Sequence, residues 1–318
     1  MRVACVQFDP VRRQPQKNAE SVQTLTESLQ PEQVDLIVLP EMALTGYIFD
    51  SLDDIEPFLE DPFAGDSKTL SLTKALAKRC ECYVIAGFPE RASARALQEV
   101  GDASSKFDAR TPMNTESASA YLPKHKHKAF NSAMLVDSSG ALVKVFRKHF
   151  LYETDTTWAD EGTGFEYIDL PSIGRVCVAI CMDLNPYTLE GEFDKYELAK
   201  YCTRNKVDYL VMPMNWLLPE EEVENYEIGT SNDAQPCVAN IHYWVARCVP
   251  LWVPGMSKPE HDGHKICFIA CNRVGKEGNT IFSGSSAVIS FTTGDRADLL
   301  GAMGTKTQGV LLLDTASS

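Results

Sequence analysis

The sequence lacks the features of proteins that bind nucleic acid or cross membranes. Its 318 residues include 30 Lys and Arg against 44 Asp and Glu, a net charge of −14, whereas affinity for nucleic acid depends on clustered cations. No apolar run approaches the roughly 20 residues that span a bilayer, and the opening Met1–Pro10 is too short and polar for a secretory signal. We therefore expect an intracellular, cytoplasmic protein with no nucleic-acid or membrane partner.

Cysteine is present at a moderate level, but without the spacing of a metal site. The close pairs among the 10 cysteines are Cys80 with Cys82 and Cys267 with Cys271. Neither pair has the two-residue spacing of a zinc knuckle, and no His follows at a suitable distance. Without a secretory signal, the thiols are expected to be reduced. We predict no metal and no cofactor.

Strand-like and helical segments alternate along the chain, which indicates a layered α/β architecture. Strands are expected at 3–8, 35–40, 83–86, 131–136, 142–147, 175–180, 209–212, 251–253, 266–270 and 287–290. Helices are expected at 18–29, 67–79, 192–202 and 234–247. No repeat or linker divides the sequence, so we predict a single domain over 1–318. Residues 91–128, rich in Ala, Ser, Lys and His, are expected to form a surface insertion.

Three reactive side chains each stand just past a predicted buried strand. Glu41 follows the apolar run 35–40, Lys148 follows the strand that ends at residue 147, and Cys181 follows the strand that ends at residue 180. Ligands of open α/β sheets bind at the carboxyl ends of strands. Each residue alone also has a structural explanation, as a helix-start carboxylate, a solvated cation or a buried thiol. Together, a nucleophile, a base and a cation are what acyl transfer requires.

The segments around these residues also identify a family. Leu39–Tyr47, Phe146–Lys148 and Ala179–Asp183 resemble the three motifs of the nitrilase, or carbon–nitrogen hydrolase, superfamily, and the resemblance extends to Val3–Gln7 and Asn131–Ala133. It covers nearly the whole chain. It implies an α/β fold of the four-layer αββα sandwich type and a Glu-Lys-Cys active site.

One branch of the superfamily matches in more detail. Lys148–Asp155 and Cys181–Tyr187 are similar to the fungal branch that removes the side-chain amide from N-terminal Asn or Gln of proteins, a step of the N-degron pathway. The resemblance implies peptide or protein N-termini bearing Asn or Gln as partners. Small-molecule nitrilases typically carry an Arg two residues after the Asp of the cysteine motif, where this chain has Asn185.

The expected mechanism is thioester chemistry. A thiol is mostly unionised at neutral pH, so Cys181 needs a base, and Glu41 is the candidate. The oxyanion needs donors that are already in place. We expect these to be the Lys148 ammonium and the backbone N–H of Met182.

An N-terminal substrate also carries an α-ammonium, which favours acidic groups beside the reacting centre. Glu153, Asp155 and Asp183 lie close to the motifs in sequence, although each is as readily explained by a helix cap or a loop ion pair. Glu153 is alternatively a support for Lys148 or Glu41. Tyr47 and Trp216 are expected to form walls of the pocket or to belong to the core.

Other functions remain open from the sequence. A small-molecule amidase acting on an aliphatic amide or a ureido acid uses the same chemistry, as does an enzyme acting on a nitrile. A non-catalytic binding module on the same fold is the third class, since function resides in site residues and not in the fold. The preference between Asn and Gln is not readable. Related hydrolases often pair through helices that flank the sheets, so a homodimer is also open.

Overall fold

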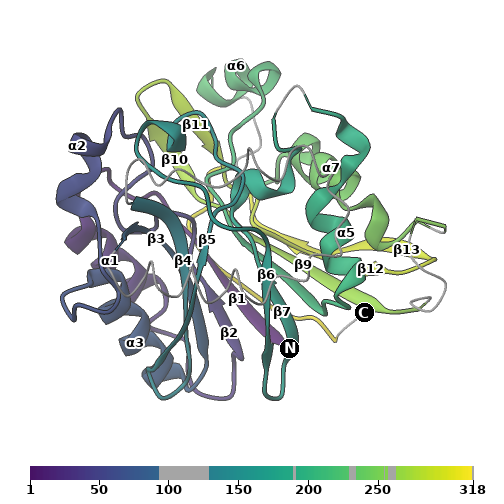
Figure 1. Cartoon of the computed structure of the whole chain (residues 1–318), viewed down its shortest axis with the longest axis horizontal. Coiled ribbons are helices and arrows are strands. Elements are labelled where there is room, and N and C mark those ends of the chain that lie inside the picture. The colour runs from purple at the N-terminus through teal and green to yellow at the C-terminus, as the bar shows by residue number, and fades with distance from the viewer. Residues whose placement is uncertain (93–128, 189–190, 229–233, 254, 257–262, 317–318) are drawn as a thin grey trace.

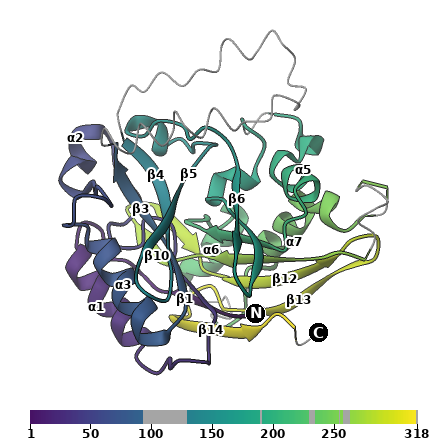
Figure 2. The same cartoon turned by 60° about the horizontal axis from the view of Figure 1, so that its bottom comes forward.

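The computed structural model describes residues 1–92, 129–188, 191–228, 234–253, 255–256 and 263–316. Two β-sheets pack face to face, and helices cover their outer faces (Figure 1). Figure 2 shows α1 (Pro15–Leu25) and α3 (Lys68–Cys80) outside the first sheet, and α5 (Glu197–Arg204) and α7 (Val238–Arg247) outside the second. The expected αββα sandwich is therefore confirmed.

The first sheet has six strands in the order β14-β1-β2-β3-β4-β5. Their bounds are Arg2–Gln7 (β1), Leu36–Val38 (β2), Tyr83–Arg91 (β3), Ala129–Val136 (β4), Leu142–Arg147 (β5) and Gly309–Asp314 (β14). The strands β1, β2 and β3 are parallel, whereas β4, β5 and β14 are antiparallel to their neighbours. As a result, β2 and β5 run in the same direction and end at the same edge of the sheet.

The second sheet has the order β13-β12-β9-β8-β7-β6, with β7, β8 and β9 parallel. Its strands are Glu166–Leu170 (β6), Gly174–Val178 (β7), Tyr209–Pro213 (β8), Lys265–Cys271 (β9), Ala287–Thr292 (β12) and Arg296–Ala302 (β13). A separate hairpin joins β10 (Val274–Glu277) and β11 (Thr280–Ser283).

Alternation along β1 shows how the sequence builds the layers. Val3 and Cys5 belong to the core between the two sheets, whereas Ala4 and Val6 belong to the core under α1 and α3. Successive side chains of a strand point to opposite faces, so a strand that is covered on both sides must be apolar throughout. The continuous apolar runs in the sequence have this origin.

The helix ends follow from local hydrogen bonds. The Ser67 side chain accepts a hydrogen bond from the Leu70 N–H at 3.0 Å and so starts α3. The first helix stops at Leu25, earlier than expected, and the Thr26 hydroxyl there donates to the Val22 carbonyl at 2.8 Å. The α5 helix starts at 197 instead of 192, since a 3-10 turn, η4 (Phe193–Lys195), precedes it.

Several expectations about elements were wrong or incomplete. The strand expected at 251–253 is not formed, because the 3-10 turn η5 (Val249–Leu251) ends within that stretch and residues 252 and 253 form a turn and a bend. The sequence missed β6, β13 and β14, which are three of the four outermost strands of the two sheets. Edge strands are partly exposed and so lack a continuous apolar run. The helix α6 (Glu220–Ile228) and the β10–β11 hairpin were also missed.

Most of the expected surface insertion lies outside the described residues, which leave out 93–128. Its first residue, Arg91, belongs to β3 and pairs with Ala129 at the start of β4. The described residues on either side of 93–128 therefore lie on neighbouring strands of the first sheet. In the part of the chain that the structure describes, no helix has the length and apolarity to cross a membrane.

Candidate active site

The structure brings the three expected residues to one place. Lys148 follows β5 directly, Glu41 comes three residues after β2, and Cys181 opens the 3-10 helix η3 (Cys181–Leu184) beyond β7. Because β2 and β5 end at the same edge of one sheet and β7 lies in the sheet packed against it, the three side chains converge. Both Glu41 and Lys148 act electrostatically on the Cys181 thiol.

The Lys148 ammonium lies between two carboxylates. Its Nζ is 2.6 Å from Glu41 Oε1 and 2.6 Å from Asp155 Oδ2, and all three side chains are fully buried. The amide of Asn131, on β4, donates to Glu41 Oε1 at 2.7 Å and to Asp155 Oδ1 at 2.9 Å. An ammonium has three donors; two are engaged by the carboxylates, and in the described part of the chain no hydrogen bond occupies the third.

Burial and neighbouring charges set the protonation of this cluster. Burial raises the pKa of the Glu41 carboxyl; the Lys148 ammonium opposes that shift and the Asp155 carboxylate adds to it. Burial disfavours the charge on Lys148, but the carboxylates of Asp155 and Glu41 raise its pKa above the ordinary value. Within the described residues, Glu41 Oε2 has no hydrogen-bond partner. That oxygen is therefore available to accept a proton.

Cys181 sits on a sharp turn at the bottom of a pocket. Its φ of +44° lies in the left-handed region that residues other than glycine seldom adopt. Its side chain is 8% exposed and lines the pocket. Burial and the Glu41 carboxylate raise the pKa of the thiol, against the Lys148 ammonium and a hydrogen bond from the Asn215 backbone. The thiol thus stays protonated until a base removes the proton.

The turn after Cys181 also presents a backbone donor. Met182 is the second residue of η3 and lines the pocket. The first N–H groups of a helix have no carbonyl partner within it. The Met182 N–H is therefore suitably placed in the chain to meet an oxyanion that forms beside Cys181.

Asp183 joins the cysteine turn to the lysine loop. Its Oδ2 accepts a hydrogen bond from the Ile180 N–H at 2.8 Å, and its Oδ1 accepts from the N–H groups of His149 at 3.0 Å and Phe150 at 2.8 Å. One buried carboxylate thus holds the two segments that carry Cys181 and Lys148. Both of its oxygens are engaged by backbone N–H groups, which agrees with the alternative expectation of a helix cap; a contact with the substrate ammonium stays a prediction.

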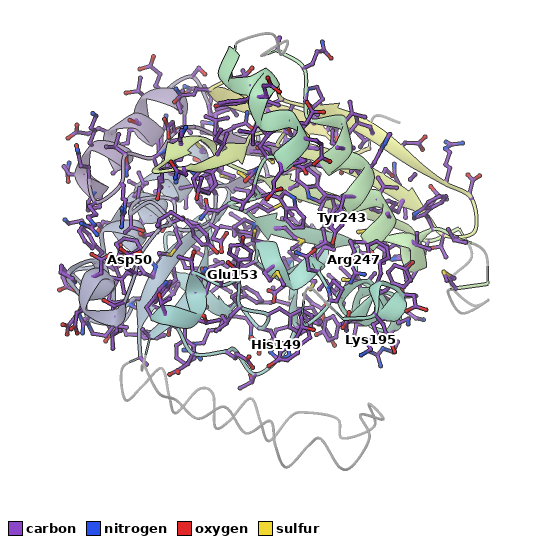
Figure 3. The ribbon with its side chains drawn as sticks, turned by 90° about the horizontal axis from the view of Figure 1, so that it is seen from above. Asp50, His149, Glu153, Lys195, Tyr243 and Arg247 are labelled. Carbon is purple, nitrogen blue, oxygen red and sulfur yellow. The ribbon has the colours of Figure 1, made fainter. Side chains whose placement is uncertain are left out.

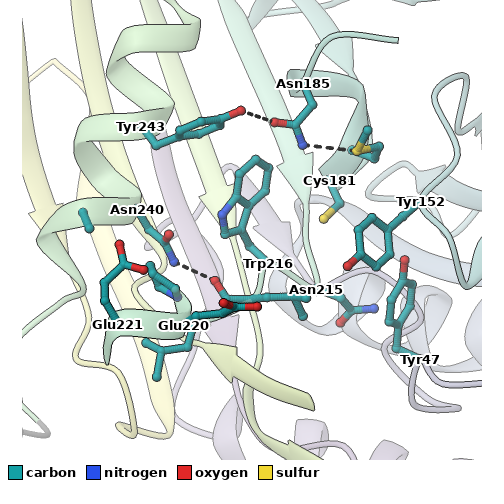
Figure 4. A pocket seen from close by; sticks show the side chains of 15 residues that line it. Tyr47, Tyr152, Cys181, Asn185, Asn215, Trp216, Glu220, Glu221, Asn240 and Tyr243 are labelled. Carbon is teal, nitrogen blue, oxygen red and sulfur yellow. Dashed lines mark hydrogen bonds between the residues drawn. The ribbon is translucent and has the colours of Figure 1, made fainter. Parts of the chain in front are cut away.

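A cavity of ≈ 460 Å³ opens above Cys181 (Figure 4). Its walls are largely aromatic and amide side chains, and its lining consists of Tyr47, Tyr152, Cys181, Met182, Asn185, Asn215, Trp216, Leu217, Leu218, Pro219, Glu220, Glu221, Ala239, Asn240 and Tyr243. The carboxylates in this lining belong to Glu220 and Glu221, and no Lys or Arg is among the described lining residues. The pocket is therefore anionic. Tyr47 and Trp216 stand on its wall.

The other acidic candidates take different roles from those expected. Glu153 is exposed and is absent from the pocket lining, and Figure 3 labels it on the face seen from above. It therefore supports neither Lys148 nor Glu41. The carboxylate beside Lys148 belongs to Asp155, which is buried and already engaged. Neither of these two residues is free in the pocket to meet a substrate ammonium.

Sequence reasoning missed Asn131, Asn215, Glu220 and Glu221 as site residues. Asn131 had been noted only as part of the resemblance to the family. Pro219 followed by acidic residues is a signal for the start of a helix, and that signal would have found α6 and the carboxylates at the pocket mouth. No spacing rule singles out Asn215, because its place depends on how β8 packs beside β7.

The loop that carries Tyr47 is fixed by the β10–β11 hairpin. The buried Glu277 carboxylate, at the end of β10, accepts hydrogen bonds from the backbone N–H of Tyr47 at 3.1 Å and of Ile48 at 2.9 Å. The same carboxylate pairs with the buried Arg273 guanidinium. The Tyr47 hydroxyl then donates to Asp155 Oδ2 at 3.3 Å. The pocket wall and the Lys148 cluster are thus one connected network.

No group of three or more His, Cys, Asp or Glu side chains in the described ranges is arranged to hold a metal ion. The chemistry that the cluster offers is that of a thiol, a carboxylate of raised pKa and a fixed ammonium. This set suits attack on a carbonyl carbon with stabilisation of the resulting oxyanion.

Two relatives of this chain carry the name protein N-terminal amidase. The protein N-terminal amidase of Schizosaccharomyces pombe is 29% identical over 328 residues, covering 98% of this chain and 98% of the relative. The protein N-terminal amidase of Saccharomyces cerevisiae is 27% identical over 201 residues, covering 58% of this chain and 36% of the relative.

Solved structures support the fold. A crystal structure of an N-terminal amidase with an Asn-Glu-Ala peptide superposes with a TM-score of 0.76 at 20% identity, over 98% of this chain and 97% of the other. The carbon–nitrogen hydrolase family matches residues 2–186, which is more than half of the chain and includes Glu41, Lys148 and Cys181. This chain is a member of the carbon–nitrogen hydrolase family.

Proposed function

We propose that this protein is an amidohydrolase that converts N-terminal Asn or Gln of proteins or peptides into Asp or Glu and releases ammonia. The observation that carries the proposal is the anionic pocket above Cys181, in which Glu220 and Glu221 are the carboxylates and no Lys or Arg contributes among the described lining residues. A free N-terminus brings an α-ammonium next to its side-chain amide, which suits such a pocket. The relatives named protein N-terminal amidases support the same substrate.

Asn185 also fits a cationic substrate. It accepts a hydrogen bond from the Tyr243 hydroxyl at 2.6 Å and lines the pocket. Small-molecule nitrilases typically carry an Arg at the position that matches Asn185. A neutral side chain here leaves the pocket without that positive charge, so an α-ammonium is not repelled.

In the first half of the reaction, Glu41 Oε2 takes the thiol proton as Cys181 Sγ attacks the carboxamide carbon. The negative charge that develops on the amide oxygen is met by the free donor of Lys148 and by the Met182 N–H. Glu41 then returns the proton to the amide nitrogen. The carbon–nitrogen bond breaks, ammonia leaves and a thioester remains on Cys181.

In the second half, Glu41 removes a proton from a water molecule that attacks the thioester carbon. The same donors hold the second oxyanion. The carbon–sulfur bond breaks, the proton passes from Glu41 to the thiolate, and the new side-chain carboxylic acid leaves. Each proton that Glu41 accepts is returned within the same half-reaction, so the cycle closes with no cofactor.

The test is intact-mass spectrometry of an Asn- or Gln-initiated peptide incubated with the protein. We expect a deamidated product and an equal amount of ammonia. We predict that Cys181→Ala and Glu41→Gln abolish turnover but leave the fold intact, because the first removes the covalent route and the second removes the base. Retained turnover in purified Cys181→Ala contradicts this mechanism.

A matched peptide with an N-acetyl group separates the candidate functions. A protein N-terminal amidase discriminates strongly against it in kcat/KM, whereas an amidase for aliphatic amides or ureido acids has no reason to prefer the free amine. Hydrolysis of small amides without peptide turnover would favour that alternative. A protein that labels no faster at Cys181 than at its other thiols and turns over neither substrate would be a binding module.

We further propose that the protein acts inside the cell as one domain. All 10 cysteines are free in the structure, which suits a reducing compartment, and β14 pairs with β1 so that both ends of the chain share one sheet. A homodimer through helices that flank the sheets is the pairing that the family resemblance suggests. Sedimentation velocity at several protein concentrations distinguishes it from a monomer.

A further inference from the structure

Asn215 is a buried amide whose hydrogen-bonding groups are unused. The residue is 2% exposed, and neither Oδ1 nor Nδ2 has a hydrogen-bond partner in the described part of the chain. Buried polar side chains are nearly always satisfied, and leaving one unpaired costs stability. A ligand that completes the missing hydrogen bonds would explain why an amide occupies this position.

The position of Asn215 connects it to the reacting centre. It comes two residues after β8 and lines the same cavity as Cys181. Its backbone also acts on the Cys181 thiol, whose pKa it lowers. In Figure 4 its carboxamide lies beside Tyr47 and Tyr152, below the cysteine sulfur. A group bound to this amide is therefore a few bonds away from the carbon under attack.

We propose that the Asn215 carboxamide binds the free N-terminus of the substrate. Its Oδ1 accepts a hydrogen bond from the α-ammonium, and its Nδ2 donates to the first peptide carbonyl. One amide offers both an acceptor and a donor, and the first residue of a peptide presents the complementary pair on either side of its α-carbon. This assignment rests on the proposed function and names the residue that selects its substrate.

The carboxylates of the site are less suited than Asn215 to hold the substrate α-ammonium in a fixed position. Asp155 is fully buried and paired with Lys148, so its charge is already matched. Glu220 and Glu221 are exposed at the mouth, where they attract a cation without fixing its position. Asn215 Oδ1 is a buried neutral acceptor close to Sγ, and it fixes the position of the α-ammonium, which the exposed carboxylates do not.

The experiment crosses an enzyme variant with a substrate variant. The substrates are an Asn-initiated peptide and its deamino analogue, a succinamoyl peptide of the same sequence that keeps the carboxamide but lacks the α-amine. In the unmodified enzyme we expect the loss of the amine to lower kcat/KM on the order of 100-fold, because it leaves the site's polar group unpaired. Asn215→Leu keeps the size of the side chain and removes the amide. In this variant we expect the kcat/KM for the Asn-initiated peptide, divided by that for the deamino analogue, to fall by about tenfold or more.

Asn240→Leu is the matched control. Asn240 lines the same pocket, but its amide already donates to the Leu217 carbonyl at 3.0 Å. We expect Asn240→Leu to have the same ratio of kcat/KM values for the two substrates as the unmodified enzyme. Thermal unfolding and the rate of Cys181 alkylation show whether each variant is folded with its thiol in place.

The possible results separate the two proposals. If the unmodified enzyme hydrolyses neither substrate, or both equally well, the N-terminal amidase function fails and the Asn215 assignment fails with it. If the unmodified enzyme prefers the free amine, and the ratio of the two kcat/KM values changes by less than tenfold in Asn215→Leu, only the Asn215 assignment is overturned. Should Asn215→Leu not fold, Asn215→Asp takes its place. It keeps an acceptor, so we expect the preference for the amine to persist or grow, and its loss would overturn the assignment.

Discussion

Lys148 and its two carboxylate neighbours form a cluster with one negative charge in excess when all three groups are ionised. All three are fully buried, so little solvent is available to offset this charge. A proton is therefore bound more readily than in water. It adds to Glu41, whose carboxyl has a pKa raised by burial and by Asp155. The arrangement provides a base whose proton affinity is adapted to removing a thiol proton.

This cluster predicts the acidic side of the pH profile. Protonated Glu41 cannot accept the thiol proton, so kcat/KM should fall as the pH drops through a value above the ordinary glutamate pKa of about 4.3. In Asp155→Asn, one of the contributions that raise the pKa of Glu41 is gone, so the fall should occur at lower pH. Profiles of both proteins on one peptide provide the measurement. An unchanged or higher midpoint in the variant contradicts the assignment of Glu41 as the base.

The exposure of Cys181 predicts its order of alkylation. All 10 cysteines are buried, but Cys181, at 8%, has the largest exposed fraction among them. Iodoacetamide should therefore modify Cys181 before the others, and the rate should rise with pH because the pKa of this thiol is raised. Peptide mapping after short reaction times identifies the site, with Cys181→Ser as control. Uniform labelling of all thiols, or no protection by a slow substrate, is the contrary result.

Site residues that stand in family motifs were predictable from the sequence. The roles of residues that are set by burial were not. Glu41, Lys148 and Cys181 occupy strand ends and family motifs, so their convergence was predictable. Glu153 and Asp155 are two positions apart, where a loop passes into a single 3-10 turn (Asp155–Thr157), and no periodicity shows which carboxylate points inward. The structure buries Asp155 and exposes Glu153.

At the level of elements, β3 holds the turn of Glu41 by close backbone contact. Gly87, in the middle of β3, has no side chain, and a Cβ there would lie 2.4 Å from Glu41 Cα and 2.7 Å from Met42 N. These are backbone atoms and cannot rotate away as a flexible side chain can. Glycine at 87 thus allows the catalytic turn to rest directly on the neighbouring strand.

We predict that Gly87→Ala displaces this turn. The variant should lose about 1–3 kcal/mol of unfolding free energy, the usual range for overpacking, and most of its kcat. Gly65→Ala is the control, since a Cβ at 65 meets nothing within 4 Å and only the positive φ opposes it. Urea unfolding and steady-state kinetics measure both effects. An active, equally stable Gly87→Ala protein would show that the contact is unimportant.

The predictability of elements follows their position in the sheets. Central strands such as β2 and β9 are covered on both faces, and their apolar runs were visible in the sequence. The outermost strands β6, β13 and β14 carry mixed exposed and buried residues and so show no continuous apolar run. Of these three, β14 pairs with a strand that is distant along the chain, β1. The β4–β5 hairpin was predictable because the turn residues 137–140 lie between two strand-like runs.

At the level of the whole molecule, β14 completes the first sheet along the outer edge of β1, with a continuous register from Arg2 with Asp314 to Gln7 with Gly309. Unpaired strand edges promote aggregation. We predict that a chain truncated after residue 308 is insoluble or inactive, whereas a chain truncated after residue 316 is soluble and active. Solubility after expression and turnover of an Asn-initiated peptide test this. Full activity of the shorter chain contradicts a structural role for β14.

The pairing of β1 with β14 has a further consequence for biosynthesis. β1 leaves the ribosome early, but the strand that covers its edge is translated last among the strands described, so the edge of β1 stays bare during nearly the whole of synthesis. Such long-range pairing is slow to form. Until residue 314 has been translated, this edge of β1 has no partner strand and is open to pairing with other chains.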